Sequence, residues 1–365
     1  MKILVVEHSD HFGLLSQLDR VISKQHEVWY LFRVRFEDSY WSTIFQPERS
    51  VFALKHKHRS VREVAFFLSI FLRGFKVSRI VINTGPEYES ATLTLLGLLA
   101  YFPHKRKLIY TVRNPAQLIQ IRRTESLARF LRRRLLMISD RLIFENEAVS
   151  LKTNEIFSKC EKKRRTILYT YTLERVARKV TKSVNDNEYS IGILGTIAPQ
   201  RRDYDVVLEA LWRLKSQISS DVRVIFLGSN HTLESQRIVS KFHSSGFNIV
   251  ACDGWLSEEN FSKLGEMCDV LLAPLKFGIK EYGNGGSTGA FGDALRFNTR
   301  LLIPAFADPI LEFSALCFYY SDSQSLAEAL IHQHGQKLGL TMDSASMSRF
   351  STDKATREFE NLVQL

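Results

Sequence analysis

Short apolar runs alternate along the chain with longer amphipathic stretches. In residues 1–183 this pattern predicts strands over 3–7, 26–32, 79–83, 108–112 and 141–145, and helices over 14–23, 61–75, 88–101 and 115–138. In residues 184–365 it predicts strands over 190–195, 222–228, 247–252, 269–273 and 299–303, and helices over 203–216, 234–244, 258–267 and 289–297. Strands that alternate with helices are typical of βα units on a parallel sheet. We therefore expect an α/β protein.

The chain is predicted to form two domains. Its 365 residues exceed the ~100 to 200 residues of an ordinary domain. Between residues 175 and 188 the composition becomes polar and charged, and a new strand pattern then begins. We expect an N-terminal domain over residues 1–180, a C-terminal domain over 188–340, and a C-terminal helix within 341–365 that crosses back to the first domain.

The two predicted domains carry opposite net charge. Residues 1–183 contain 34 Lys and Arg against 17 Asp and Glu, whereas residues 184–365 contain 16 against 22. Six of these basic residues lie on the predicted helix over 115–138, where apolar residues alternate with arginines, among them Arg122, Arg123, Arg132, Arg133 and Arg134. A cationic amphipathic helix suits an anionic membrane surface, which attracts each basic residue by ~1 kcal/mol. We expect these five arginines to contact the membrane.

The same basic stretch suits a nucleic-acid backbone, because phosphates attract it equally well. No familiar nucleic-acid-binding motif accompanies the charge, so we expect no nucleic-acid partner. The longest apolar runs, residues 64–72 and 91–102, are shorter than the ~20 residues that cross a bilayer. Since no signal-like segment follows Met1, we expect a cytoplasmic protein, peripheral at the inner face of the cytoplasmic membrane.

The sequence shows no metal-binding pattern. Its four cysteines lie far apart, without a histidine at ligand spacing. Asp203 and Asp205 form a D-x-D pattern, but they fall just inside a predicted helix, where carboxylates complement the helix dipole. We therefore expect no metal and no cofactor.

Six segments of the second half follow one another in a recognisable order. They are residues 191–211, 222–228, 253–261, 268–274, 285–295 and 298–304. They resemble the C-terminal domain of GT-B glycosyltransferases, in particular the nucleotide-sugar-dependent family 4-like enzymes (glycosyl transferases group 1). The resemblance implies two Rossmann-like domains with parallel sheets that face each other across a cleft. It also implies that the C-terminal domain binds a nucleotide-sugar donor and the N-terminal domain an acceptor.

The chain departs from that family at two places. The family's paired glutamates would fall on Gly285 and Asp293, so one carboxylate remains, as an aspartate. Glu281 lies four residues before Gly285, and a loop could bring it into the same site. In the first half, residues 108–114 stand where many relatives have a T-x-H motif, with Arg113 in place of the histidine. The resemblance is thus to a divergent, bacterial surface-polysaccharide transferase.

A nucleotide-sugar site needs cations or backbone amides for the diphosphate and a carboxylate for the ribose hydroxyls. Glycines before the predicted helix 289–297 would let amides and the positive helix end approach phosphate oxygens. A guanidinium can grip a diphosphate and offset the charge of the leaving group without a metal. We expect a donor site made of Gly195, Thr196, Arg201, Arg202, Lys280, Glu281, Gly286, Ser287, Thr288 and Asp293.

These donor-site residues have simpler alternatives. Ser287 and Thr288 are common helix caps, Asp293 would complement a helix dipole, and paired arginines are often a solvated surface.

The first domain is expected to supply the base. Ligands of parallel sheets gather at the carboxyl ends of the strands. The loop over residues 7–13 follows the first predicted strand and contains Asp10 and His11, either of which could deprotonate an acceptor hydroxyl. Arg113, at the end of another strand, is expected to contact the donor phosphate or the acceptor.

Taken together, these features indicate a hexosyltransferase. It would move a sugar from a nucleoside diphosphate sugar to a hydroxyl of a lipid-linked cell-surface glycan, in polysaccharide or lipopolysaccharide biosynthesis. Two alternatives stay open: a non-catalytic GT-B-like binding or scaffold protein, and a basic nucleic-acid-binding protein. A sugar-nucleotide epimerase shares the architecture, but its requirements are not recognisable in the sequence.

Overall fold

The computed structural model contains two compact units. The N-terminal unit is built from the first 172 residues together with the segment Arg349–Leu365, and the C-terminal unit from most of the residues between them. The residues that the structure describes are 1–7, 12–33, 50–54, 68–70, 72–74, 76–83, 108–113, 115, 133, 135–158, 163–169, 188–254, 256–279, 282, 288–335 and 348–364.

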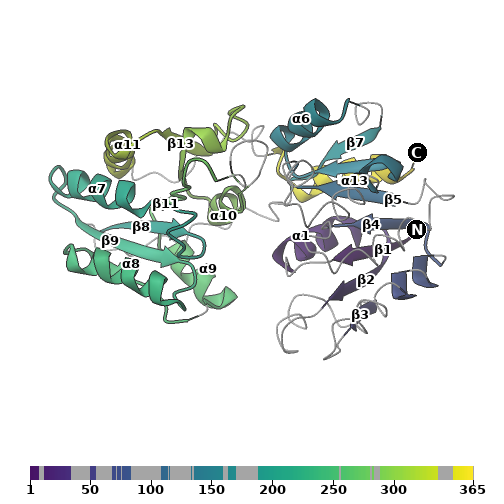
Figure 1. Cartoon of the computed structure of the whole chain (residues 1–365), viewed down its shortest axis with the longest axis horizontal. Coiled ribbons are helices and arrows are strands. Elements are labelled where there is room, and N and C mark those ends of the chain that lie inside the picture. Colours follow the sequence, from purple (N-terminus) through teal and green to yellow (C-terminus); the bar gives the residue numbers. More distant parts are fainter. Residues whose placement is uncertain are drawn as a thin grey trace, which may run out of the picture. The chain divides into compact units, whose positions relative to one another are not determined.

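A parallel sheet forms the centre of the N-terminal unit (Figure 1). Its seven described strands are β1 (Lys2–Glu7), β2 (Glu27–Arg33), β3 (Ser50–Leu54), β4 (Arg79–Ile82), β5 (Leu108–Val112), β6 (Arg141–Phe144) and β7 (Arg164–Ile167). They lie in the order β3-β2-β1-β4-β5-β6-β7, and every pair is parallel. The order reverses direction between β1 and β4, which makes this pair the topological switch point of the sheet.

Both faces of this sheet are buried, which explains the nearly continuous apolar sequence of its strands. Along β1, Ile3 and Val5 face a core shared with α1 (Phe12–Ile22) and α13 (Thr352–Gln364), while Leu4 and Val6 face the opposite core. That second core includes Leu135 and Leu136. A further helix, α6 (Glu147–Ile156), begins at Asn146, whose Oδ1 accepts a 2.8 Å bond from the amide of Val149.

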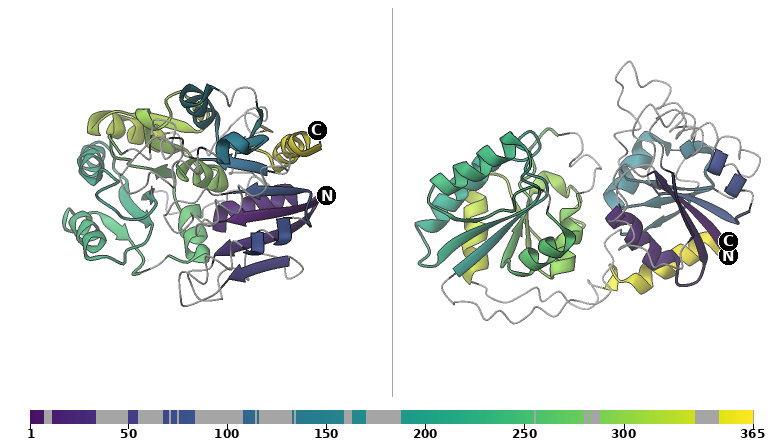
Figure 2. Two further views of the ribbon diagram at one scale, coloured as in Figure 1. Left: turned by 45° about the vertical axis from the view of Figure 1, so that its right-hand side comes forward. Right: turned by 90° about the horizontal axis from the view of Figure 1, so that it is seen from below.

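The C-terminal helix α13 lies beside α1 in the N-terminal unit (Figure 2). Its apolar residues, among them the fully buried Phe359, contribute to the same core as α1. The guanidinium groups of Arg79 and Arg141 each donate a 3.0 Å hydrogen bond to the carbonyl of Val363 in its last turn. Basic side chains stabilise the free carbonyls and the negative dipole end of a helix, so these two arginines fix where α13 ends.

The C-terminal unit has a second parallel sheet. In its described part the strands are β8 (Glu188–Leu194), β9 (Asp221–Leu227), β10 (Asn248–Val250), β11 (Val270–Leu272), β12 (Leu301–Pro304) and β13 (Cys317–Tyr320). They lie in the order β10-β9-β8-β11-β12-β13 with parallel pairing throughout. Here the order reverses between β8 and β11, which is therefore the switch point of this sheet.

Helices pack on the C-terminal sheet in two groups. The helices α7 (Tyr204–Lys215), α8 (Leu233–Ser244) and α11 (Ser323–Gly335) share one apolar core with the sheet. The helices α9 (Glu258–Glu266) and α10 (Ala290–Phe297) contact each other through Phe261 and Phe297, whose ring centroids lie 5.4 Å apart. A 3-10 turn, η6 (Ala305–Ala307), follows β12.

These elements confirm the α/β class and most of the predicted pattern, with several differences. The sequence pattern did not predict β3, β7, β13, α6 or α11. The placement of Asp203 inside a helix was wrong: it is the N-cap of α7, and its Oδ1 accepts a 3.3 Å bond from the amide of Val206. Asp205 does lie in the first turn. The predicted helix over 88–101 and most of those over 61–75 and 115–138 lie outside the described residues.

Candidate functional site

Two loops flank the switch point of the C-terminal sheet. One follows β8 and spans residues 195–203, and the other follows β11 and leads to α10. In open parallel sheets, ligands bind outside the carboxyl ends of the strands at the switch point. These loops and the first turn of α10 hold the described members of the predicted donor site.

The first loop begins with a turn that requires glycine. Gly195 has φ +84°, a conformation that side chains strongly disfavour, and its amide donates a 3.0 Å bond to the carbonyl of Leu227 in β9. A Cβ atom on Gly195 would lie 2.0 Å from Nη2 of Arg202. A Cβ atom on Gly228 would lie only 2.0 Å from the carbonyl oxygen of Gly195. Two glycines therefore let the loop fold closely over the end of β9.

Backbone hydrogen bonds join the two loops. The amide of Asp203 donates a 2.8 Å bond to the carbonyl of Pro274, and the amide of Lys276 donates a 3.0 Å bond to the carbonyl of Arg201. Arg202 forms an antiparallel bridge with Leu275, while its Nε donates a 3.0 Å bond to the carbonyl of Thr196. The loops after β8 and β11 thus form one connected surface, with Arg202 folded over the glycine turn.

Arg201 extends from this surface and is held by a tyrosine. Its Nη2 donates a 2.7 Å hydrogen bond to the hydroxyl of Tyr282, and its guanidinium carbon lies 5.4 Å from the centroid of the Tyr282 ring. Tyr282 is buried, whereas Arg201 is exposed. A buried tyrosine thus orients an exposed cation at the switch point, a contact that the sequence pattern did not reveal.

The amino end of α10 also belongs to the loop that follows β11. Its N-cap residue is Gly289, which supplies no capping side chain, and Oγ1 of Thr288 accepts a 3.4 Å bond from the amide of Ala290. Asp293 lies half-buried in the first turn, and its amide bonds the carbonyl of Gly289 at 3.1 Å. The positive end of the helix dipole and a carboxylate therefore meet in one turn.

A buried tyrosine contacts the loop that follows β8. The hydroxyl of Tyr204 accepts a 3.3 Å hydrogen bond from the amide of Ala198, and burial raises the pKa of Tyr204 to about 12. Burial also raises the pKa of Tyr320, at the end of β13. Both side chains are buried, so loss of the phenolic proton is disfavoured in the folded protein.

In the N-terminal unit, Arg113 follows β5 and donates a 2.9 Å bond from Nη2 to Oδ1 of Asn83. Arg133 is half-buried, with its guanidinium carbon 5.4 Å from the centroid of the Phe157 ring. The other predicted site residues lie outside the described part of the chain: Asp10, His11, Arg122, Arg123, Arg132, Arg134, Lys280, Glu281, Gly286 and Ser287.

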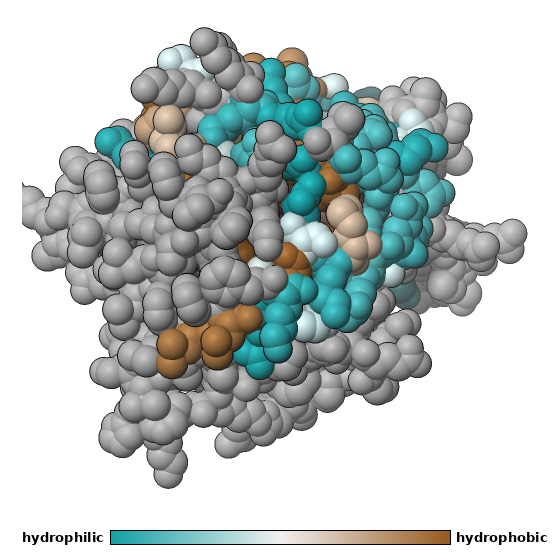
Figure 3. Space-filling view, turned by 90° about the vertical axis from the view of Figure 1, so that its right-hand side faces the viewer, coloured by the Kyte–Doolittle hydropathy of each residue, from teal (hydrophilic) through white to brown (hydrophobic). Residues whose placement is uncertain are grey.

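Other features of the described residues bear on metals and membranes. No group of three or more His, Cys, Asp and Glu residues in that part of the chain is arranged to hold a metal ion. Among the helices of the described segments, none is both long and apolar enough to cross a bilayer. On the face shown in Figure 3, hydrophilic side chains predominate among the described residues, and hydrophobic ones form small separate patches.

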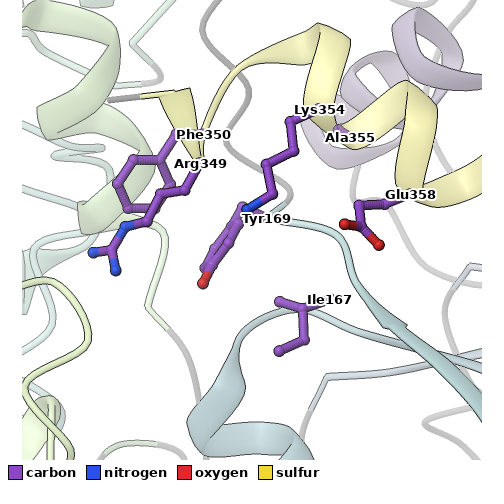
Figure 4. Close-up of a pocket in the computed structure, with 7 residues that line it drawn as sticks. All are labelled: Ile167, Tyr169, Arg349, Phe350, Lys354, Ala355 and Glu358. Carbon is purple, nitrogen blue, oxygen red and sulfur yellow. The ribbon is translucent and has the colours of Figure 1, made fainter. Parts of the chain in front are cut away.

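A small pocket lies where the C-terminal segment meets the edge strand β7 (Figure 4). It is lined by Ile167, Tyr169, Arg349, Phe350, Lys354, Ala355 and Glu358. The rings of Tyr169 and Phe350 meet edge to face at 4.9 Å between centroids, and Glu358 accepts a 3.2 Å bond from Thr166. Because β7 is at the edge of its sheet, this pocket is separate from the β1/β4 switch point.

Solved structures share this fold over nearly the whole chain. A glycosyltransferase from Rickettsia africae has a TM-score of 0.67 at 10% identity, over 100% of this chain and 98% of its own. HepE of Anabaena, in complex with UDP and glucose, has a TM-score of 0.61 at 14% identity over 100% of both chains. The UDP-GlcNAc 2-epimerase of Methanocaldococcus jannaschii has a TM-score of 0.61 at 10% identity, over 100% of this chain and 99% of its own.

No protein-family model and no curated protein matches the sequence. The agreement with solved chains over their full lengths shows the architecture. The protein has a divergent GT-B glycosyltransferase-like fold, with two Rossmann-like units.

Proposed function

We propose that this protein is a glycosyltransferase that uses a nucleoside diphosphate sugar, with its donor site at the β8/β11 switch point. The observation that carries the proposal is the joined loop surface there, which holds Arg201 and the Gly195 turn and leads along the chain to the amino end of α10. HepE and the Rickettsia glycosyltransferase share the fold, and HepE was solved with UDP and glucose. A UDP-sugar is therefore the donor class that we favour.

Each group in the site has a role in this proposal. Arg201 and the α10 dipole bind the diphosphate, and Asp293 accepts hydrogen bonds from the ribose hydroxyls. During transfer the acceptor oxygen attacks the anomeric carbon, and the bond from that carbon to the diphosphate breaks. The leaving nucleoside diphosphate gains negative charge, which a guanidinium and a helix dipole offset without a metal ion. Asp10 or His11 takes the proton of the acceptor hydroxyl.

The finer assignments are part of the same proposal. The acceptor is a hydroxyl of a lipid-linked cell-surface glycan, and the protein acts peripherally at the inner face of the cytoplasmic membrane. The support is the excess of basic residues in the first half of the chain, 34 against 17 acidic ones. Anionic lipids attract such a surface.

A panel of nucleotide sugars tests the donor site. We expect one nucleotide family among UDP-, GDP- and dTDP-sugars to raise the melting temperature of the full chain, equally with and without EDTA, whereas CMP-sugars, which have a single phosphate, should not. The Asp293→Ala variant should lose most of that increase, because the ribose hydroxyls lose their acceptor. If no nucleotide sugar stabilises the protein, the scaffold or nucleic-acid alternatives replace this proposal.

An epimerase is the second candidate, because the Methanocaldococcus neighbour is a UDP-GlcNAc 2-epimerase. The two activities leave different products. Glycosyl transfer releases the free nucleoside diphosphate, whereas epimerisation returns an intact nucleotide sugar with inverted C2. Incubation of the protein with UDP-sugars and an extracted glycolipid, followed by nucleotide analysis, separates them.

A further inference from the structure

Three polar side chains lie together at the carboxyl edge of the N-terminal sheet. Glu7 is the last residue of β1 and is fully buried, Asn83 follows β4 and is 1% exposed, and Arg113 follows β5 and is half-buried. Because β1, β4 and β5 are neighbours in the sheet, the three residues form a row. Glu7 and Asn83 flank the switch point, the place where parallel sheets bind ligands.

Hydrogen bonds connect the row from end to end. Nδ2 of Asn83 donates a 2.6 Å bond to Oε2 of Glu7, and Nη2 of Arg113 donates a 2.9 Å bond to Oδ1 of Asn83. The guanidinium fixes the orientation of the Asn83 amide, because a guanidinium only donates and must therefore face the amide oxygen. The backbone amide of Asn83 bonds the carbonyl of Val6 at 3.0 Å, which holds the residue in register with β1.

The guanidinium of Arg113 still has unused donors. Its Nε and Nη1 atoms are buried, and within the described structure neither has a hydrogen-bond partner. A buried charged donor without an acceptor is costly, so such a group calls for a specific explanation. Arg79 and Arg141 also have a buried Nε without a hydrogen-bond partner in the described structure, but their guanidinium groups bind the last turn of α13 through the carbonyl of Val363. Arg113 has no such structural task among the described contacts, and it lies at the ligand-binding edge.

We propose that Glu7, Asn83 and Arg113 form a second ligand site, in which Arg113 binds an oxyanion of the sugar acceptor. Asn83 and Glu7 are positioning residues, which hold the guanidinium toward the ligand. The identification of the ligand as the acceptor rests on the proposed transferase function. The oxyanion is a phosphate, as in a lipid phosphate, or a carboxylate, as in an acidic sugar.

The unpaired Nε and Nη1 donors of Arg113 favour an oxyanion as the ligand. Only acceptors can satisfy them, and hydrogen bonds from a guanidinium to phosphate or carboxylate are stronger than those to neutral groups. A neutral hydroxyl would satisfy a donor but would bring no negative charge to the half-buried guanidinium. Asn83 stands between the guanidinium and the Glu7 carboxylate, so Arg113 keeps its attraction for an incoming anion.

Titration calorimetry on the full chain tests this site while UDP saturates the donor site. The probes are inorganic phosphate and glucuronate, which represent the two sources of the oxyanion. We expect at least one probe to bind the unaltered protein. Arg113→Gln should weaken that binding at least tenfold, Arg113→Lys should weaken it less, and Asn83→Leu should weaken it about three- to tenfold. The matched control Arg165→Gln, an exposed arginine of β7, should leave it unchanged.

The UDP affinity of each variant separates this proposal from the donor-site proposal. We expect the same UDP affinity in all of these proteins. Because the variants change the N-terminal unit, an unchanged circular dichroism spectrum and melting temperature show that this unit is folded. If UDP binds but neither anion does, or if Arg113→Gln binds the anion as tightly as the unaltered protein, the second site is overturned and the donor site stands. If Arg113→Gln instead loses UDP affinity, Arg113 contacts the donor, which also overturns the proposal. If Asn83 has only a structural role, the folded Asn83→Leu protein will bind the anion as tightly as the unaltered protein does. That result would contradict the positioning role of Asn83.

Discussion

The guanidinium of Arg201 and the hydroxyl of Tyr282 are joined by a 2.7 Å hydrogen bond across 81 residues of sequence. The tyrosine is buried and the arginine exposed, so the pair fixes a cation at the switch point of the C-terminal sheet. A pre-positioned guanidinium loses less conformational entropy when it binds a diphosphate. The proposed affinity for the donor therefore depends on Tyr282 as well as on Arg201.

Replacing Tyr282 with phenylalanine tests that dependence. The variant keeps the ring beneath Arg201 but loses one hydrogen bond, which contributes about 0.5 to 1.5 kcal/mol. We expect UDP affinity to fall about two- to tenfold, measured by calorimetry, with little change in melting temperature. Tyr189→Phe is the matched control, since its hydroxyl bonds the carbonyl of Leu330 away from the loops. Equal UDP affinity in Tyr282→Phe and the unaltered protein would show that the tyrosine does not position the cation.

The glycine turn after β8 gives a second prediction. In Gly195→Ala the new Cβ strains a left-handed backbone and displaces the guanidinium of Arg202 from its bond to Thr196, so we expect a loss of about 1.5 to 3.5 kcal/mol of unfolding free energy. Gly246→Ala is the control: Gly246 has φ +80° but only Nζ of Lys215 within 4 Å, at 3.8 Å. It should lose only about 1 to 2 kcal/mol. Denaturant unfolding measures both variants. Equal losses of unfolding free energy in the two variants would show that displacing Arg202 does not destabilise the protein.

The buried Tyr204 predicts alkaline sensitivity of the C-terminal unit. Its pKa is raised from 10.0 to about 12, so the folded state keeps the phenolic proton where the unfolded chain releases it. Its contribution to stability is complete below pH 10 and is lost as the pH rises toward 12. A difference of one in pKa corresponds to about 1.4 kcal/mol, so the loss reaches up to about 3 kcal/mol. Tyr204→Phe should flatten this fall in stability between pH 10 and 12, monitored by unfolding at each pH. An identical pH profile would contradict the assignment.

The C-terminal helix gives a prediction about the N-terminal unit. Phe359 of α13 is fully buried against α1 and the sheet, so Phe359→Ala should cost about 3 to 5 kcal/mol of unfolding free energy. The exposed Asn361 on the same helix supplies the control variant Asn361→Ala, which should change stability by less than about 0.5 kcal/mol. Calorimetric melting measures both. A small loss in Phe359→Ala would mean that α13 contributes little to this core.

Much of the fold is visible in the sequence, because each buried parallel strand is a compact apolar run. This is why β1, β5, β8 and β9 are predicted almost at their observed bounds. The helix α6 is not visible, since only Val149, Ser150 and Thr153 are buried and its apolar periodicity is weak. The edge strand β13 has only four residues, Cys317–Tyr320, and only the first and last of them are buried, so it shows neither a continuous buried run nor a regular alternation. Such short elements form because the neighbouring strand offers them hydrogen bonds.

The candidate sites show a similar division. The glycine turn at Gly195 and the two arginines were suggested by local sequence. The contacts that orient them were not, because Tyr282 is an isolated aromatic residue in a loop. Likewise, Glu7 and Asn83 each end an ordinary apolar strand, and 76 residues separate them. Their partnership follows from the strand order, which places β4 directly beside β1.

The most direct test of the donor site is the affinity of the full chain for UDP in three forms: unaltered, Arg201→Ala and Arg213→Ala. Arg213 is an exposed arginine on α7 that pairs with Glu209 at 2.8 Å, outside the switch-point loops. Charge-assisted hydrogen bonds contribute about 1.5 to 3 kcal/mol, so Arg201→Ala should bind UDP roughly 10- to 100-fold more weakly. Arg213→Ala should match the unaltered protein. If both variants bind UDP as tightly as the unaltered protein does, the donor site is not at the β8/β11 switch point. If the unaltered protein does not bind UDP, a UDP-sugar is not its donor.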